Sequence, residues 1–342
     1  MYYIELTDNQ QRVYIDTIQI YQAYREAFKE LSRYSGSMRW KKSGGHEYLF
    51  RAYGRYGNGK SLGPRDAEKE ALKERFMQEK DEANARLRNL SDSLAEQARF
   101  CKAAKINRVP NIVTGILRNM DNQKLLGTSL YVVGTYALYA YETMAGIRFE
   151  SGITATSDID FLWHDAKKLR LNSELSVRGL MGVLTDTDKT FRRMKQKYKA
   201  INSKGFEVDL IKHETINPFI DDMNPGIGGN DDLQAVEINS QKWMAAPQKI
   251  EAVVIGLDGY PSPISVPDPR VYVLHKLWMS KDPSRDNKKR RRDKTQAIAV
   301  AEIILNYLPN YKFSEKDLRL LPKKIIELGK KEKSMPAGFK IA

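Results

Sequence analysis

The sequence is poor in the residues that build disulfides and zinc sites. Its 342 residues include one cysteine, Cys101, and four histidines. A single cysteine excludes an intrachain disulfide and a cysteine-based zinc site. The histidines (His46, His164, His213 and His275) show no HExxH or other short metal-ligand spacing. We therefore expect no zinc centre, and we assign Cys101, in a polar helical stretch, to packing or to the surface.

The sequence also lacks long apolar segments. No window approaches the roughly 18–20 consecutive apolar residues that a membrane span requires, and Met1–Glu5 lacks the basic-then-apolar design of a secretory signal. With 41% hydrophobic and 29% charged residues, the chain can bury a core, which excludes a disordered or low-complexity protein. We expect a soluble, cytoplasmic protein with no membrane partner, and its length suggests about two domains.

Acidic residues are scarce in the C-terminal part of the chain. The whole sequence has 57 Lys and Arg against 43 Asp and Glu, a net charge of +14, and residues 270–342 alone hold 19 against 8. The densest run of basic residues in this part of the chain can neutralise the phosphates of a nucleic acid. The alternative is that the run forms a solvated loop, which aids solubility. The candidate nucleic-acid-binding residues in this run are Arg285, Lys288, Lys289, Arg290, Arg291 and Arg292.

The N-terminal third is predicted to be mostly helical. Apolar residues at spacings of three and four predict a helix over residues 9–33, and two short apolar runs around a Gly-Gly pair predict a hairpin over Met38–Tyr53. From Pro64 a polar helix is expected to run to about Lys105. Because it is long for a globular helix, we expect it to be broken, or packed as a helical hairpin or arm.

One segment satisfies the P-loop pattern GxxxxGK[ST], which binds phosphates when a helix begins at its Gly-Lys-Ser. Gly54–Ser61 matches the pattern, but Gly63 and Pro64 follow too soon for a helix to begin at Lys60. We therefore interpret the segment as a basic, aromatic loop that can contact a nucleotide or RNA, and not as an ATPase site.

Strand patterns replace helical ones in the middle of the chain. The predicted strands cover residues 129–133, 156–163, 206–211, 250–255 and 264–266, and the predicted helices cover residues 111–120, 136–146, 189–199 and 268–280.

Two carboxylates share one face of the strand predicted over residues 156–163. Alternation turns Asp158 and Asp160 to one side and their apolar neighbours to the other. Carboxylates this close repel each other, and a divalent cation offsets the repulsion. Magnesium prefers oxygen ligands and completes its shell with substrate phosphates. Asp209, in another apolar strand, is the natural third carboxylate, with Glu207 as the competing choice.

Three segments, in this order, resemble the signature of the nucleotidyltransferase superfamily typified by DNA polymerase beta. The signature has an apolar residue followed by Gly and a small residue, then Asp-x-Asp between apolar residues, and later an Asp on a strand. The matching segments are Val133-Gly134-Thr135, Asp158-Ile159-Asp160-Phe161 and Val208-Asp209-Leu210.

Two further segments, one in a later predicted helix and one in the basic run, extend the resemblance to a smaller group of families. With His275-Lys276-Leu277 and Arg292-Asp293-Lys294, the chain resembles bacterial nucleotidyltransferase-fold families related to abortive-infection toxins. The resemblance covers about residues 126–300. Thr135 stands where Gly or Ser is usual, and the 22 residues between Thr135 and Asp158 imply an extra segment over Ala145–Ala155.

The resemblance implies a role for each matching residue. Gly134 lets the backbone approach the triphosphate, while Thr135 and Lys276 bind phosphate oxygens. Asp293 orients Lys276 or the basic run, unless it only caps the apolar helix that follows. The residues implied as catalytic, and as ligands of two Mg²⁺ ions with Mn²⁺ as an alternative, are Asp158, Asp160 and Asp209.

The expected architecture is α+β, with a small mixed β-sheet nucleotidyltransferase core flanked by N-terminal and C-terminal helical regions. The expected domains are a mainly helical region over residues 1–125, a catalytic core over residues 126–268 and a basic helical region over residues 269–342. The long polar helix could pair with a copy of itself, but the sequence does not indicate an oligomeric state.

The expected function is magnesium-dependent transfer of a nucleoside monophosphate from an NTP to a hydroxyl group of RNA or tRNA, and a toxin would use the same reaction. One alternative is a catalytically silent nucleic-acid-binding protein. Another is a transferase that acts on a protein or small-molecule hydroxyl.

Overall fold

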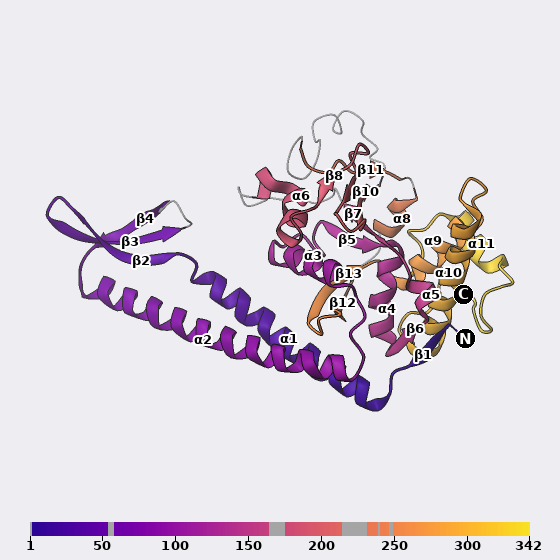
Figure 1. The fold of residues 1–342 in the computed structure, drawn as a ribbon, viewed down its shortest axis with the longest axis horizontal. Helices are drawn as coiled ribbons and strands as arrows, with labels where there is room; N and C mark the ends of the chain where they lie inside the picture. Colours follow the sequence, from indigo (N-terminus) through magenta and orange to yellow (C-terminus); the bar gives the residue numbers. More distant parts are fainter. Residues whose placement is uncertain (1, 54–57, 164–174, 214–230, 239, 246–248) are drawn as a thin grey trace. The chain divides into compact units, whose positions relative to one another are not determined.

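The computed structural model describes residues 2–53, 58–163, 175–213, 231–238, 240–245 and 249–342. The chain forms two compact units (Figure 1). The core unit comprises Met1–Gln11 and Asn107–Ala342, and the arm comprises Arg12–Ile106.

Two long helices form most of the arm. They are α1 (Asp8–Arg33) and α2 (Ala67–Ala103), which lie side by side in Figure 1. The Gln97 amide donates hydrogen bonds to the Val13 carbonyl oxygen (3.1 Å) and the Thr17 hydroxyl (3.0 Å). The Thr17 hydroxyl also lies 3.1 Å from the sulfur of Cys101, which is fully buried. Cys101 therefore has a packing role between the two helices.

α2 is one continuous helix of 37 residues, so the prediction of a broken helix is wrong and the prediction of a helical arm is confirmed. The Asp66 carboxylate caps its first turn by accepting a hydrogen bond from the Lys69 amide (2.7 Å). No glycine or proline interrupts the segment. Its helix-forming residues therefore meet no breaker.

A small antiparallel sheet completes the arm and confirms the predicted hairpin. Its strands, in spatial order, are β2 (Ser37–Ser43), β3 (His46–Tyr53) and β4 (Asn58–Pro64). Lys60 and Ser61 of the P-loop pattern lie within β4, where no helix begins. Residues 54–57 of the pattern lie outside the described residues.

A mixed sheet forms the centre of the core unit, which is α+β as expected. Its strands are β5 (Leu130–Val133), β7 (Asp158–Trp163), β8 (Arg192–Arg193), β9 (Lys199–Ile201), β10 (Glu207–Lys212) and β11 (Val236–Glu237). β5 is antiparallel to β7, β7 is parallel to β10, and β10 is antiparallel to β9. β9 also pairs with β8, and β11 pairs with β10.

Helices and a hairpin pack around this sheet and confirm most of the predicted elements. The elements are α3 (Asn111–Asn122), the 3₁₀ turn η1 (Gly134–Tyr136), α4 (Ala137–Ala145), α6 (Leu175–Thr187), α8 (Gln241–Ala245), β12 (Ile250–Ile255), β13 (Pro261–Val266), α9 (Pro269–Ser280), α10 (Asn287–Tyr307) and α11 (Lys323–Lys331). α3 contacts β13 and α6, α4 contacts β12, and α9 contacts α10 and α11.

A short strand near the start of the chain belongs to the core unit. β1 (Tyr3–Glu5) pairs antiparallel with β6 (Ile147–Phe149). The extra segment expected over Ala145–Ala155 therefore contains β6, followed by the single turn α5 (Ser151–Thr154). This segment supplies the pairing partner of β1.

The helix predicted over Lys189–Lys199 is wrong. The segment contains β8 and the first residue of β9, and β9 pairs with β10. Phe191, Met194 and Tyr198 imitate helical spacing, but of these three only Phe191 is buried. Strand pairing satisfies the backbone groups and buries Ala200, and this tertiary context overrides the local pattern.

Aspartates cap the two helices that carry the basic C-terminal part. The Asp268 carboxylate accepts from the Arg270 amide (2.8 Å) at the start of α9. The Asp286 carboxylate accepts from the amides of Lys288 (2.9 Å) and Lys289 (3.1 Å) at the start of α10. Asp293 lies inside α10, so its assignment as a helix cap is wrong.

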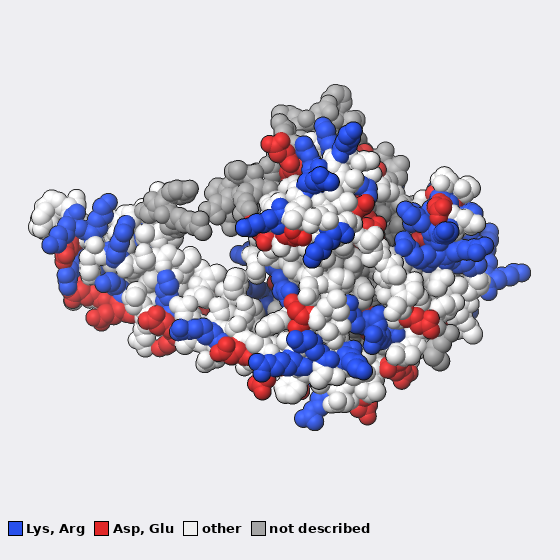
Figure 2. All heavy atoms as spheres, viewed as in Figure 1, with Lys and Arg blue, Asp and Glu red and all other residues white. Residues whose placement is uncertain are grey.

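Lys and Arg side chains gather on the surface that Figure 1 labels α9, α10 and α11 (Figure 2). Within the described part of the chain, no helix combines the length and the apolar character needed to cross a bilayer.

Candidate active site

Four strands of the core sheet place one residue each in a single row. Val133 of β5 pairs with Asp160 of β7, Asp160 pairs with Asp209 of β10, and Asp209 pairs with Lys199 of β9. Paired residues on neighbouring strands turn their side chains to the same face. The row therefore sets two carboxylates and an ammonium group side by side.

Alternation along β7 separates its polar and apolar side chains. Ile159 and Phe161 are fully buried on one face, whereas Asp158 and Asp160 are partly exposed on the other. The predicted facing of these two aspartates is confirmed. Asp158 also accepts a hydrogen bond from the Thr156 hydroxyl, which fixes the orientation of its carboxylate.

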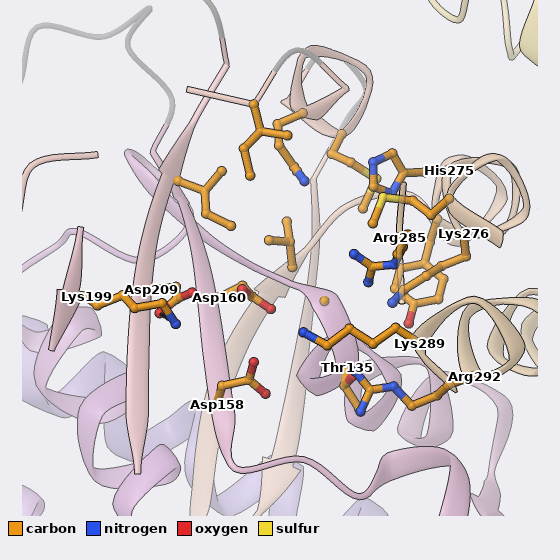
Figure 3. Close-up of a pocket in the computed structure, with 18 residues that line it drawn as sticks. Thr135, Asp158, Asp160, Lys199, Asp209, His275, Lys276, Arg285, Lys289 and Arg292 are labelled. Atoms are coloured by element: carbon orange, nitrogen blue, oxygen red, sulfur yellow. Dashed lines mark ion pairs between the residues drawn. The ribbon is translucent and has the colours of Figure 1, made fainter. Parts of the chain in front are cut away.

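A pocket lies over the carboxylate face of the sheet. Figure 3 shows the carboxylates on one side of the pocket and cationic side chains on the other. The residues predicted from the sequence that line it are Gly134, Thr135, Asp158, Asp160, Asp209, Lys276, Arg285, Lys289 and Arg292.

The surroundings of Asp160 disfavour its negatively charged form. Burial raises the pKa of Asp160 to about 7, and the neighbouring carboxylates of Asp158 and Asp209 act in the same direction. Lys276 and Lys199 oppose this shift without cancelling it. The site thus favours binding of a proton or a metal cation at Asp160.

Lys199 partly neutralises the carboxylates of β10. Its ammonium nitrogen lies 2.8 Å from Glu207 Oε2 and 3.0 Å from Asp209 Oδ1. Although partial burial acts against protonation, these two contacts raise the pKa of Lys199. Burial also raises the pKa of Asp209, with Lys199 opposing the shift. Of the two competing carboxylates, Asp209 lines the pocket and Glu207 does not.

Gly134 permits the close approach of the β5 end to Asp160. Its φ is +68°, in the left-handed region, and a Cβ built at this position would lie 2.2 Å from Asp160 Oδ2. A side chain here would be strained and would displace the carboxylate. Glycine is therefore required by both the backbone and the site.

We expect Gly134→Ala to lower the free energy of unfolding by about 3 kcal/mol, because it adds the collision with Asp160 to the roughly 1–2 kcal/mol cost of a left-handed alanine. Gly205→Ala is the matched control, since Gly205 has a φ of +78° but no atom within 4 Å of the position that a Cβ would take. Urea unfolding of both variants measures the difference. Equal losses would show that Asp160 and its surroundings accommodate the methyl group.

The Thr135 hydroxyl is tied to the C-terminal helices. It accepts a hydrogen bond from the Gln296 amide of α10 (3.3 Å), and that amide also donates to the Ile153 carbonyl oxygen (2.9 Å). Thr135 and Gln296 are both buried. Gln296 thus joins α10 to the turn that follows β5.

The basic run divides into two groups because it enters a helix. Arg285, Lys289 and Arg292 line the pocket, and Figure 3 shows Lys289 and Arg292 extending toward the side where Asp158 and Asp160 lie. The other three residues of the run do not line it: Lys288, Arg290 and Arg291. Lys289 and Arg292 are three residues apart on α10 and so lie on one helical face, whereas Arg285 precedes the Asp286 cap of that helix.

Lys276 and Asp293 form a buried ion pair behind the pocket. The Lys276 ammonium lies 2.8 Å from Asp293 Oδ1, and Arg285 Nε lies 2.5 Å from Asp293 Oδ2. Burial lowers the pKa of Lys276. Burial alone would raise the pKa of Asp293, but Lys276 and Arg285 outweigh it and lower the pKa. Asp293 therefore orients Lys276 and Arg285.

Within the described residues, no group of three or more His, Cys, Asp or Glu side chains is arranged to hold a metal ion by itself. Asp158 and Asp160 nevertheless offer adjacent oxygen donors. Magnesium is usually bound by one or two carboxylates together with substrate phosphates. These two carboxylates fit such a shared site, while Asp209 is already paired with Lys199.

The sequence interpretation misses Lys199, which lines the pocket, and Gln296, which contacts the pocket residue Thr135. Lys199 lies in a lysine-rich segment where nothing local identifies its carboxylate partners. Gln296 likewise carries no motif. The grouping of Lys289 with Arg292 did have a signal, because their spacing is helical, whereas Arg285 lies before the start of α10.

A family model described as nucleotidyltransferase matches residues 111–321. No curated protein and no solved structure matches the chain.

Proposed function

The chain belongs to the nucleotidyltransferase family, and on this premise we propose that its pocket transfers a nucleoside monophosphate from an NTP to a hydroxyl group of RNA, in a magnesium-dependent reaction. The observation that carries this proposal is the division of charge across the pocket. Carboxylates form one wall, and the four cationic side chains of Lys276, Arg285, Lys289 and Arg292 form the other.

Asp158 and Asp160 are the proposed magnesium ligands, with Mn²⁺ as the alternative ion. Bound there, the metal would neutralise phosphate charge and lower the pKa of the acceptor hydroxyl. Asp209 is the proposed third catalytic carboxylate, which faces the same pocket beside Asp160. Lys199 holds Asp209 in place and limits the repulsion between the carboxylates.

The cations opposite the carboxylates are the proposed triphosphate ligands. Arg285, Lys289 and Arg292 can each make charge-assisted hydrogen bonds to phosphate oxygens. Such contacts position the substrate and stabilise the charge that develops on the leaving pyrophosphate. Gly134 and Thr135 are the proposed contacts from the turn after β5. Lys276 lines the pocket as well, although its ammonium group already pairs with Asp293.

We expect Lys289→Gln/Arg292→Gln to raise the KM for NTP about 100-fold or more, because each of the two lost charge-assisted hydrogen bonds is worth about 1.5–3 kcal/mol. Lys288→Gln/Arg291→Gln is the matched control: it removes the same charge from α10, but from residues that do not line the pocket. The control should stay within about threefold of wild type in KM for NTP. Steady-state kinetics at varied NTP concentration measure the KM of each double variant. An equal increase in the KM of the two double variants would contradict phosphate binding in the pocket.

RNA is the proposed acceptor because of the charge that remains outside the pocket. Lys288 and Arg291 are exposed on α10, and Figure 2 shows many further cations on the C-terminal helices. A polyanion is the natural ligand of such a surface. A cationic small-molecule acceptor would instead be repelled by it.

The direct test supplies each α-labelled NTP in turn with magnesium and total RNA. We expect label in RNA with wild-type protein and none with Asp158→Asn. Label in a protein or a small molecule instead would refute the RNA acceptor while keeping the transferase assignment. No incorporation into any acceptor would contradict the proposed reaction.

A further inference from the structure

The small sheet of the arm has two chemically different faces. On the inner face, Met38 and Leu49 are buried against Phe76 of α2, and Trp40 and Leu72 pack beside them. Trp40 pairs with Leu49 across β2 and β3, which fixes the register of this face. The inner face is the hydrophobic core of the arm.

The outer face carries aromatic and cationic side chains instead. Arg39 pairs with Phe50 and Lys41 pairs with Tyr48 in the same register. Because side chains alternate along a strand, these four residues point away from the core that contains Met38 and Leu49. We call Arg39, Lys41, Tyr48 and Phe50 the outer face.

The exposure of these residues leaves them available to a ligand. Arg39 and Lys41 are exposed, and Tyr48 and Phe50 are partly exposed. The Lys41 ammonium lies 5.2 Å from the centre of the Phe50 ring. A positive charge thus sits beside an accessible aromatic ring.

Charge identifies the kind of partner that the outer face fits. Residues 37–64 contain six Lys and Arg but one acidic residue, Glu47. Glu47 pairs with Lys42 in the register of the inner face, and Arg65 Nη1 lies 2.6 Å from its carboxylate. No acidic side chain therefore belongs to the outer face, and its partner is expected to be anionic.

The spacing of the Tyr48 and Phe50 rings indicates which kind of anionic partner the outer face binds. Tyr48 and Phe50 are two residues apart on β3, about 7 Å along the strand. Aromatic rings flanked by cations bind single-stranded nucleic acids by stacking on bases while the cations neutralise phosphates. Double-stranded RNA would not offer unstacked bases.

We propose that the outer face binds single-stranded RNA, with bases against Tyr48 and Phe50 and phosphates against Arg39 and Lys41. The choice of RNA rests on the proposed function, in which RNA is the acceptor. The arm then adds a second RNA contact, whose residues are separate from the catalytic pocket.

The test measures binding of the full chain to a fluorescein-labelled 12-nucleotide RNA without self-complementarity, by anisotropy, in EDTA and without NTP. We expect Tyr48→Leu/Phe50→Leu, which keeps apolar bulk but removes the rings, to weaken binding about tenfold or more. Arg39→Gln/Lys41→Gln should weaken binding and reduce the slope of log K against log salt by about 1.4.

Lys42→Gln/Lys60→Gln is the matched control. It removes the same charge from β2 and β4, but Lys42 pairs with Glu47 and Lys60 pairs with Arg51, both on the inner face. The control should bind RNA within about twofold of wild type. Unaltered binding by both outer-face variants, equal losses with the control, or tighter binding of DNA of the same sequence would each overturn the proposal.

The experiment separates this proposal from the proposed function. Asp160→Asn should bind the RNA as wild type does, because binding is measured without NTP or metal. If labelled NTP never enters RNA but the outer-face variants still lose binding, the proposed reaction fails and the RNA surface stands. If RNA is labelled but the outer-face variants bind normally, the reaction stands and the surface proposal fails.

Discussion

Asp160→Asn is expected to reduce the rate of nucleotidyl transfer by a factor on the order of 10²–10³ or more, as loss of a charge-stabilising group in an active site does. Asp160 lies at the centre of the carboxylate row, next to Gly134 and paired with Asp209. The Asn keeps the shape but removes a charged metal ligand. Single-turnover transfer at saturating NTP is the measurement that separates this loss from weaker NTP binding.

The same substitution should not destabilise the protein. In EDTA, a neutral Asn relieves the repulsion from Asp158 and Asp209, so the Tm of Asp160→Asn should equal or exceed that of wild type. Glu207→Gln is the control, because Glu207 contacts Lys199 on the same sheet face without lining the pocket. We expect it to keep transfer within about tenfold of wild type. A fully active Asp160→Asn would remove Asp160 from the catalytic residues.

Asp293→Ala is expected to cost about 3–5 kcal/mol of stability, because removing one partner of a buried ion pair leaves an uncompensated charge. Asp293 is fully buried and faces both Lys276 and Arg285. The lost free energy should appear as a lower urea midpoint with an unchanged slope.

Asp286→Ala is the reference substitution at the same helix, and the stability loss of Asp293→Ala is compared with its loss. Asp286 caps α10 from an exposed position, so its removal should cost about 1 kcal/mol. The double variant Lys276→Met/Asp293→Leu should recover part of the stability, since an apolar pair can replace a buried ion pair. If Asp293→Ala loses no more stability than Asp286→Ala, the Lys276 and Arg285 charges that Asp293 leaves unpaired are solvated in the variant.

The strands that carry the carboxylates are predictable because polar and apolar residues alternate in them. Ile159 and Phe161 in β7, with Val208 and Leu210 in β10, form a fully buried face. What the sequence does not contain is the pairing of Asp209 with Asp160, because no local feature determines which residues of two distant strands align.

The failures of sequence interpretation also have identifiable physical causes. Helical spacing of apolar residues over Lys189–Lys199 is outweighed by pairing with β10, and that same pairing brings Lys199 to Asp209. Asp293 precedes an apolar run, which imitates a cap, but α10 begins about two turns earlier, after its cap Asp286. The first error therefore comes from a long-range strand pairing, and the second comes from a different cap earlier in the chain.

The placement of β1 before the arm bears on the order in which the chain folds. Between β1 and β6 the chain passes through the whole arm, Arg12–Ile106. If that span were flexible, closing it would be entropically unfavourable; shortening a loop roughly tenfold recovers about 2 kcal/mol. The contacts of Thr17 with Gln97 and Cys101 bring the two ends of the span together. If the two arm helices pair early, they hold the ends of the arm together and so reduce the entropic cost of pairing β1 with β6.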